Sequence, residues 1–168
     1  MSAANQLLNP RQTAQKVTRM AYEICEQNLE ESNVIVAGIF DEGYRLAQML
    51  VEQLRAIAPF TVELLQVKLD KTAATQPNVL LDNSSISFEN QAVVLVDDVL
   101  NSGRTLTYAL APFLAKGCKK LQVAVLVERS HRTFPIRADF VGYALATTIQ
   151  EHISVQLSEA ESVGVYLG

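Results

Sequence analysis

The stretch of sequence that decides the fold is AVVLVDDVLNSGRT, residues 92–105. Its opening residues are apolar and mostly β-branched, which is typical of a strand covered on both faces of a parallel sheet. Two acids, Asp97 and Asp98, stand at the carboxyl end of this run, and a short polar loop then leads into a helical pattern from Leu106 to Leu114. Ligands of open α/β sheets bind outside the carboxyl ends of strands. The stretch therefore predicts both a parallel sheet and the place of its site.

The polar loop Asn101–Thr105 has the composition of a phosphate-binding site. Gly103 and its small neighbours allow backbone amides to converge at a helix N-terminus, where the helix dipole also favours an anion. Ser102 and Thr105 can donate hydroxyl hydrogen bonds, and Arg104 adds a positive charge. The two acids ahead of the loop suit sugar hydroxyls, or a Mg²⁺ ion that also binds a substrate phosphate. Carboxylates beside a phosphate loop predict a ribose 5-phosphate ligand.

Length and composition narrow the class of protein. A chain of 168 residues with 49% hydrophobic and 19% charged residues is expected to form one domain, residues 1–168, with a substantial core. The net charge of −4 argues against a general nucleic-acid surface. Cys25 and Cys118 form no CxxC pair, so we expect buried free thiols. Without an apolar run of membrane length or a signal-peptide core, we expect a soluble, cytoplasmic protein.

Strand and helix patterns alternate along most of the chain, which predicts an α/β fold with a parallel sheet. Asn9 and Pro10 have the residue types of a helix N-cap and first helical position. A second helical pattern follows Tyr44. The strands that we expect span residues 34–40, 60–69, 93–96, 121–127 and 140–146, followed by a terminal β-hairpin at 152–157 and 163–167. Residues 70–90 are polar with little periodicity, and a loop of this length is either functional or an uncommitted surface loop.

The pattern over residues 93–105 resembles the phosphoribosyl pyrophosphate (PRPP) signature of type I phosphoribosyltransferases: an apolar strand, two acids, two apolar residues and a short Ser-Gly-Arg-Thr loop. The resemblance implies the type I phosphoribosyltransferase fold, with a parallel sheet of about five strands, flanking helices and a small C-terminal hood that includes the β-hairpin. It also implies a transferase that uses PRPP together with Mg²⁺.

A second motif, LVERSHRTFPIRADFVGYALATT at residues 126–148, resembles the PyrR branch of that family, whose members attenuate pyrimidine operons and act as uracil phosphoribosyltransferases. This resemblance implies transfer of phosphoribose from PRPP to uracil or a similar base, in pyrimidine salvage. Relatives are commonly dimers or larger, so we expect a homo-oligomer. Asn101 stands where some purine-specific relatives carry an aspartate, and its amide cannot accept a proton at neutral pH, which also favours a uracil-type base.

The resemblance implies roles residue by residue. Asp97 and Asp98 would bind the ribose hydroxyls of PRPP, directly or through a magnesium-bound water, and Asn101–Thr105 would bind the 5-phosphate. The pyrophosphate loop would be Asp41, Glu42 and Gly43. The base pocket would be lined by Phe140, Val141 and Gly142, with Arg132 also assigned to the base. Residues 128–139 form a cationic segment that contains Arg129, His131, Arg132 and Arg137. This segment as a whole has three possible partners, namely pyrophosphate, the base or another subunit.

Two departures from the family pattern keep alternatives open. Asp41 and Glu42 stand where relatives of the PyrR branch have Thr and Arg, and the segment after the strand that ends near Leu69 has a single cation, Lys71. Each charged hydrogen bond contributes roughly 1.5–3 kcal/mol, so pyrophosphate binding would be weakened. The alternative function is a PRPP- or nucleotide-sensing regulator that has lost catalysis. A third hypothesis is RNA binding, which the balance of 14 Lys and Arg against 18 Asp and Glu disfavours.

Overall fold

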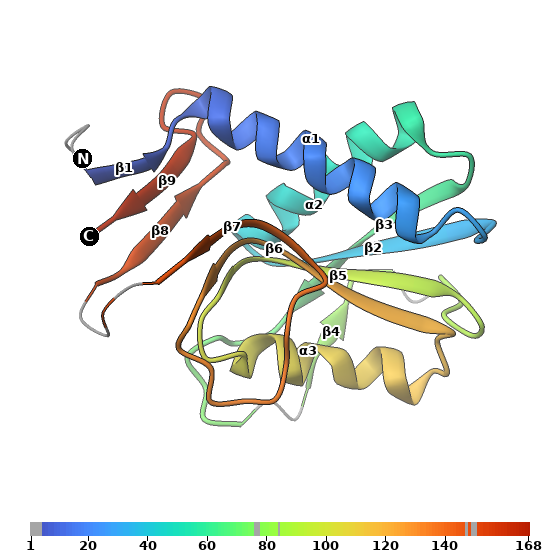
Figure 1. Cartoon of the computed structure of the whole chain (residues 1–168). Coiled ribbons are helices and arrows are strands. Elements are labelled where there is room, and N and C mark those ends of the chain that lie inside the picture. Colours follow the sequence, from blue (N-terminus) through green and yellow to red (C-terminus); the bar gives the residue numbers. More distant parts are fainter. Residues whose placement is uncertain (1–4, 76–77, 84, 147, 149–150) are drawn as a thin grey trace.

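The chain is described by a computed structural model over residues 5–75, 78–83, 85–146, 148 and 151–168. A six-stranded sheet organises it, with the order β4-β3-β2-β5-β6-β7 (Figure 1). Its strands are β2 (Asn33–Ile39), β3 (Thr61–Lys68), β4 (Leu80–Leu81), β5 (Ala92–Leu100), β6 (Lys120–Arg129) and β7 (Phe140–Leu145). All neighbours pair in parallel except β4, which pairs antiparallel with β3. The type I phosphoribosyltransferase fold is confirmed, and β4 adds a short antiparallel edge to it.

Helices cover both faces of this sheet. Figure 1 shows α1 (Pro10–Gln27) and α2 (Glu42–Ile57) on one face and α3 (Arg104–Ala115) on the other. The start of α1 confirms the sequence prediction, because the Asn9 side chain accepts a hydrogen bond from the backbone N–H of Gln12 and Pro10 is the first helical residue. The helices that the structure describes include none long and apolar enough to cross a membrane.

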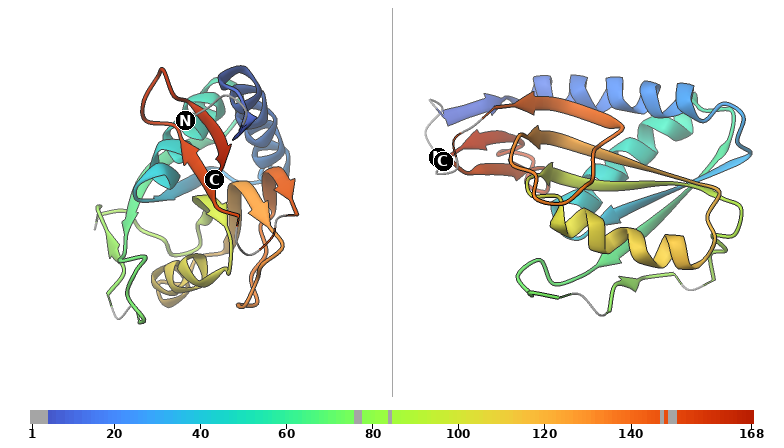
Figure 2. Two further views of the ribbon diagram at one scale, coloured as in Figure 1. Left: turned by 90° about the vertical axis from the view of Figure 1, so that its left-hand side faces the viewer. Right: turned by 60° about the horizontal axis from the view of Figure 1, so that its bottom comes forward.

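A second, three-stranded antiparallel sheet with the order β1-β9-β8 forms the hood. It contains β1 (Gln6–Leu8), β8 (Ile153–Gln156) and β9 (Gly164–Leu167). The predicted terminal hairpin is confirmed as β8 and β9. The hood is not built from C-terminal segments alone, because β1 pairs with β9 and brings the N-terminal part of the chain into it. The right-hand view in Figure 2 shows the hood beyond the end of the main sheet.

The central strand β5 is longer than its apolar run. Residues 92–96 are buried under helices from both sides, and pairing with β6 continues beyond them. Asp97 is opposite Val125, and Leu100 is opposite Glu128. The two acids therefore lie inside a paired strand, where the backbone that carries them is held by the sheet.

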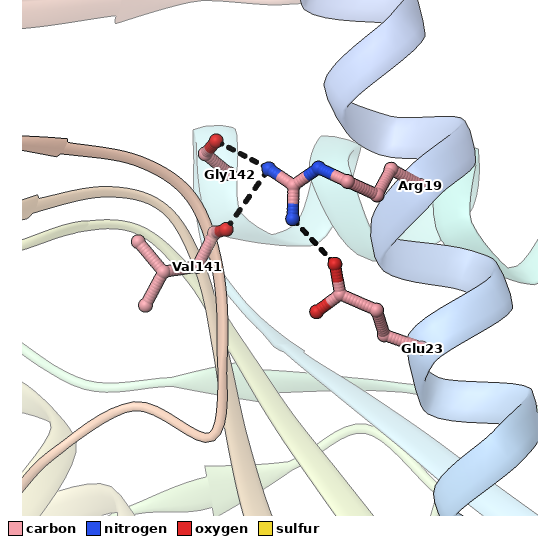
Figure 3. A network of polar contacts seen from close by, with 4 residues as sticks. All are labelled: Arg19, Glu23, Val141 and Gly142. Atoms are coloured by element: carbon pink, nitrogen blue, oxygen red, sulfur yellow. Dashed lines mark hydrogen bonds and ion pairs between the residues drawn. The ribbon is translucent and has the colours of Figure 1, made fainter.

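The outer strand of the sheet, β7, is fastened to α1 by one arginine. Arg19 donates hydrogen bonds to the carbonyl oxygens of Val141, at 3.2 Å, and Gly142, at 2.6 Å, and it pairs with Glu23 one turn further along α1 (Figure 3). Because β7 has a sheet neighbour on one side only, these bonds satisfy carbonyls that would otherwise face solvent.

The polar segment 70–90 is partly ordered by these elements. Leu80 and Leu81 of β4 pair with Lys68 and Val67 of β3, and Asp70 accepts hydrogen bonds from the backbone N–H and the hydroxyl of Thr72. These hydrogen bonds hold the pKa of Asp70 below its ordinary value. Gln76, Pro77 and Ser84 of this segment lie outside the described residues.

Candidate functional site

A cavity of about 350 Å³ opens where β5 ends and the hood begins. One wall is β5 and the loop that leads into α3, the opposite wall is β8 of the hood, and Lys71 reaches in from the segment after β3. The lining residues are Lys71, Asp97 to Leu106, and His152 to Val155. The cavity therefore brings the predicted ribose-binding acids and the whole predicted phosphate loop together with a hood strand.

Asp97 and Asp98 differ in their surroundings although they are adjacent in the sequence. The Asp97 side chain is 3% exposed, and that of Asp98 is 20% exposed. One carboxylate oxygen of Asp97, Oδ1, accepts a hydrogen bond from the backbone N–H of Asp98 at 2.9 Å. Asp97 is thus the fixed, buried member of the pair, and Asp98 is the one more open to a ligand.

Lys71 holds the two carboxylates together. Its Nζ lies 3.1 Å from Oδ1 of Asp97 and 3.7 Å from Oδ1 of Asp98. Burial raises the pKa of Asp97 well above its ordinary value, the negative charge of Asp98 raises it further, and the ammonium of Lys71 acts in the opposite direction. Burial lowers the pKa of Lys71, but the two carboxylates outweigh that effect, so its pKa is raised. The lysine therefore favours the ionised form of Asp97 in the absence of a ligand.

The predicted phosphate loop has the backbone geometry that its sequence implied. Gly103 is the N-cap of α3 with a left-handed φ of 85°, and a Cβ built on it would lie 2.3 Å from Cγ2 of Ile136. A side chain at this position would therefore be strained by the backbone conformation and crowded by a neighbour. The carbonyl of Gly103 accepts hydrogen bonds from the backbone N–H and the hydroxyl of Thr107, which begins the helix directly behind the loop.

The cationic segment supports this loop from outside the cavity. The carbonyl of Ser102 accepts hydrogen bonds from the backbone N–H groups of Thr133, at 2.9 Å, and Phe134, at 3.0 Å. Arg129 is buried, and it donates to Oδ1 of Asn101 at 3.1 Å and to the backbone carbonyls of Thr148 and Glu151. The segment thus fixes the conformation of the loop and joins it to the chain that leads into the hood.

The segment after β3 also reaches the α3 N-terminus. Arg104 donates a hydrogen bond to the carbonyl of Ala73, and its guanidinium carbon lies 5.5 Å from the centre of the Tyr108 ring. Together with the Lys71 contacts, this bond holds residues 71–73 against the phosphate loop. The guanidinium of Arg104, which we predicted to bind phosphate, is hydrogen bonded to this segment.

The predicted pyrophosphate loop lies behind the buried acid. A Cβ on Gly43 would lie 2.8 Å from Oδ1 of Asp97, so the absence of a side chain allows this close approach. Asp41 is exposed and precedes the first turn of α2. The Glu42 carboxylate is directed to the hood, where it accepts hydrogen bonds from the N–H of Leu157 and the hydroxyl of Ser158. The residues described as lining the cavity do not include these three.

The residues predicted to bind the base lie elsewhere as well. Phe140 is buried in the core under α1, and a Cβ on Gly142 would lie 2.6 Å from the carbonyl of Leu126. Val141 packs with the cluster on the opposite face. Arg132 donates to the carbonyl of Ile136 at 3.1 Å and is 3.6 Å from Glu128. The lining described for the cavity contains none of the four. Phe140, Val141 and Gly142 belong to the outer strand β7, and Arg132 lies in the loop between β6 and β7.

The second wall of the cavity was missed by the sequence analysis. It consists of His152, Ile153, Ser154 and Val155. Ile153 and Val155 are buried and alternate with the more exposed His152 and Ser154, so the strand pattern was visible in the sequence. The surface that the hairpin covers could not be predicted from the sequence, because it depends on how the hood packs against β5. Lys71 was singled out as the one cation of its segment, but its contact with the acids was not predicted.

The donor set of the cavity fits a magnesium ion that arrives with a phosphorylated substrate. Two carboxylates converge on one side, and Mg²⁺ is usually bound by one or two carboxylates together with water and substrate phosphates. The described residues contain no group of three or more His, Cys, Asp or Glu able to hold a metal by themselves. Asp97 and Asp98 are therefore the residues that would face such an ion.

Comparison with known proteins identifies the family. The model of the phosphoribosyl transferase domain family matches residues 3–160. The chain belongs to the type I phosphoribosyltransferase family. Within it, the chain is 38% identical over 163 residues to the "Bifunctional protein PyrR" of Pelotomaculum thermopropionicum, covering 93% of this chain and 90% of the relative. It is 35% identical over 164 residues to the protein of the same name from Bacillus subtilis, covering 92% and 91%.

Solved structures of phosphoribosyltransferases share the fold. A hypoxanthine-guanine phosphoribosyltransferase from Bacillus anthracis superposes with a TM-score of 0.77 at 18% identity, covering 99% of this chain and 98% of the other. The hypoxanthine phosphoribosyltransferase of Trypanosoma cruzi gives a TM-score of 0.79 at 15% identity, covering 97% and 95%. At these identities the likeness establishes the phosphoribosyltransferase fold, and the PyrR relatives establish the branch of the family.

Proposed function

We propose that this chain transfers the phosphoribosyl group of PRPP to uracil or a similar base and releases pyrophosphate. The observation that carries the proposal is the cavity in which Asp97, Asp98 and the loop Asn101–Thr105 meet the hood strand β8. Its volume of about 350 Å³ lies within the range typical of small-molecule sites. The resemblance to the PyrR branch supports uracil as the base.

Each wall of the cavity has a part in the proposed reaction. The Asp98 carboxylate, as the more exposed acid, holds the ribose hydroxyls, and Asp97 supports it from the buried side. The N-terminal amides of α3 and the hydroxyls of Ser102 and Thr105 hold the 5-phosphate. For such contacts Lys71 has to leave the carboxylates, or share them with the ligand.

The chemical step exchanges two bonds at C1 of the ribose. The bond from C1 to the pyrophosphate oxygen breaks, a ring nitrogen of the base forms the new bond, and the proton of that nitrogen passes to the departing pyrophosphate or to water. Positive charge develops on the ribose in the transition state, and the carboxylate of Asp98, with Asp97 behind it, stabilises that charge. Magnesium bound with PRPP would supply neutralisation of the negative charge on the departing pyrophosphate.

We assign the base to the space between Leu100 and the hood. Leu100 at the end of β5 and Ile153 and Val155 of β8 all line the cavity, so a flat ring bound between them would lie beside apolar residues. His152 and Ser154 supply polar atoms for the edge of the base. This assignment replaces Phe140–Gly142 as the proposed base-binding surface.

The test is product formation from PRPP, Mg²⁺ and a panel of bases, with uracil, hypoxanthine and guanine as the first members. Chromatography of the nucleotides and an assay of pyrophosphate are run on the same samples. We expect uridine monophosphate and pyrophosphate in equal amounts with uracil. Formation of a purine nucleotide in place of uridine monophosphate would overturn the base assignment, and no product with any base would overturn the activity.

A second candidate is a nucleotide-sensing protein without catalysis. The observations that favour it are the acids Asp41 and Glu42 in the predicted pyrophosphate loop and the ammonium of Lys71 on both active-site carboxylates. This candidate predicts that uridine monophosphate raises the melting temperature although no base yields pyrophosphate. Thermal shift and pyrophosphate release, measured side by side, separate the two candidates.

A further inference from the structure

Side chains from the first turn of α2 form hydrogen bonds with the residues that follow the hood strand β8. Oε2 of Glu42 accepts a hydrogen bond from the backbone N–H of Leu157 at 2.8 Å, and Oε1 accepts one from the hydroxyl of Ser158 at 3.0 Å. Nε of Arg45 lies 3.5 Å from the carbonyl oxygen of Leu157 and donates to it. Both backbone polar groups of Leu157 are therefore held by side chains from one turn of one helix.

Leu157 directly follows β8, the strand that forms the hood wall of the cavity. β8 is the outer strand of the hood, hydrogen bonded to β9 on one side, and its residues Ile153–Val155 line the cavity together with His152. Leu157 is itself buried, so its position is set by the core as well as by Glu42. A short extended segment therefore joins Leu157 to the residues that line the cavity.

The other end of this connection is the buried acid. Gly43, next to Glu42 in the chain, lies against Asp97 so closely that a Cβ would come within 2.8 Å of the carboxylate. The side chain of Asp41 makes no capping hydrogen bond to α2, and the polar links described from this turn to the hood are those of the Glu42 carboxylate and the Arg45 guanidinium. The same turn thus contacts the ribose-binding acid on one side and the hood on the other.

We propose that Glu42 is a positioning residue that sets the distance between the hood wall and the acids Asp97 and Asp98, and thereby sets affinity for the base part of a nucleotide. The proposal rests on the proposed function and deepens it. It also explains an acid in the predicted pyrophosphate loop: the negative charge is engaged by an N–H and a hydroxyl of the hood, in hydrogen bonds that a charged acceptor strengthens.

The experiment compares Glu42→Ala and Glu42→Gln with Glu52→Gln, which removes one charge from an exposed position of the same helix. Two ligands are titrated by calorimetry: uridine monophosphate, which reaches the hood, and ribose 5-phosphate, which does not. Hydrogen exchange of peptides that cover β8 and Leu157 is followed by mass spectrometry. The exchange rate of the Leu157 amide reports its hydrogen bond to Glu42 directly, and this measurement needs no ligand.

We expect Glu42→Ala to speed amide hydrogen exchange at Leu157 and to lower the affinity for uridine monophosphate by roughly tenfold. The affinity for ribose 5-phosphate should stay within about twofold of that of the unmodified protein. Glu42→Gln, whose amide oxygen can accept one of the two hydrogen bonds, gives an intermediate loss, and Glu52→Gln gives none. Unchanged exchange in Glu42→Ala, or an equal loss for both ligands, would overturn the positioning role.

Failure of the proposed function looks different. If the unmodified protein binds ribose 5-phosphate but no nucleotide, the base assignment is wrong. Faster exchange at Leu157 in Glu42→Ala would still establish that Glu42 holds the hood through its hydrogen bond to Leu157. If exchange is unchanged while the unmodified protein binds uridine monophosphate and forms it from uracil, the proposed function stands and the role of Glu42 falls.

Discussion

The two walls of the cavity are built in different ways. The wall that carries Asp97, Asp98 and the phosphate loop is one continuous stretch of chain inside the central strand and the helix after it. The hood wall, residues 152–155, belongs to a small sheet at the end of the molecule and is held there by contacts such as those of Glu42. The ribose-phosphate wall, as we propose it, is therefore one stretch of the main sheet and α3. The proposed base wall belongs to the hood, which packs on the core through Ile153 and Val155 and is joined to α2 by polar links.

This contrast orders the expected effects of mutation. Changes in the ribose-phosphate wall should affect every phosphorylated ribose ligand, whereas changes in the hood should affect only ligands that carry a base.

Asp98→Asn should have the largest effect on turnover. It removes the more exposed of the two carboxylates without changing the size of the side chain, so we expect the rate to fall by roughly 100- to 1,000-fold or more. The melting temperature should change little. The check is pyrophosphate release together with a thermal melt, and full activity in a folded variant would contradict the role given to this acid.

Gly103→Ala should remove binding of both ribose 5-phosphate and uridine monophosphate and should destabilise the protein by about 1–3 kcal/mol. A side chain at φ 85° is strained, and its Cβ would lie 2.3 Å from Ile136. Gly117→Ala is the matched control, since Gly117 has a φ of 70° but no atom within 4 Å of its Cβ position. Denaturant melts and calorimetry should show the smaller stability loss and normal ligand binding for the control.

Lys71→Met should destabilise the protein by about 1 kcal/mol at pH 8, a modest value because the lysine is partly exposed. Burial and the charge of Asp98 raise the pKa of Asp97, and loss of the lysine raises it further. A group with a raised pKa in the folded state favours folding below its unfolded pKa and loses that contribution as the pH rises through its folded pKa.

The stability loss in Lys71→Met should therefore shrink as the pH falls and Asp97 becomes protonated. Urea melts between pH 4 and pH 8 measure it. Lys68→Met, an exposed lysine of β3, is the control. A loss of stability that is the same at every pH would mean that Lys71 does not act through Asp97.

His152→Ala should have the smallest effect. It trims one side chain from the hood wall, so we expect uridine monophosphate to bind roughly three- to tenfold more weakly and ribose 5-phosphate to bind as before. His131→Ala, outside the described cavity lining, is the control. Equal weakening of both ligands would show that the two walls do not act separately.

The same contrast explains what could be predicted from the sequence. The parallel sheet, the strand-loop-helix unit and the juxtaposition of Asp97, Asp98 and Gly103 follow from one local pattern, because a buried strand and a glycine at a helix start fix their own geometry. The hood hairpin was predicted as an element, but not the surface that it covers. The three-residue strand β1 is too short for any periodic pattern.

Two interactions at the site lay beyond sequence reasoning for a related reason. Glu42 and Leu157 are 115 residues apart, and Lys71 and Asp97 are 26 residues apart. Each pair forms because elements pack in three dimensions, and no spacing rule connects them. Phe140–Gly142 were assigned to the base from a motif, yet as residues of the outer strand they pack on the core and on Arg19.

The most direct test of this account is a crystal structure of the protein with uridine monophosphate. We predict the phosphate on the loop Asn101–Thr105, the ribose hydroxyls on Asp98 with Lys71 displaced, and the uracil ring between Leu100 and residues 152–155. A uracil ring bound against Phe140–Gly142, with the hood wall empty, would contradict the division of the site into a ribose-phosphate wall and a base wall.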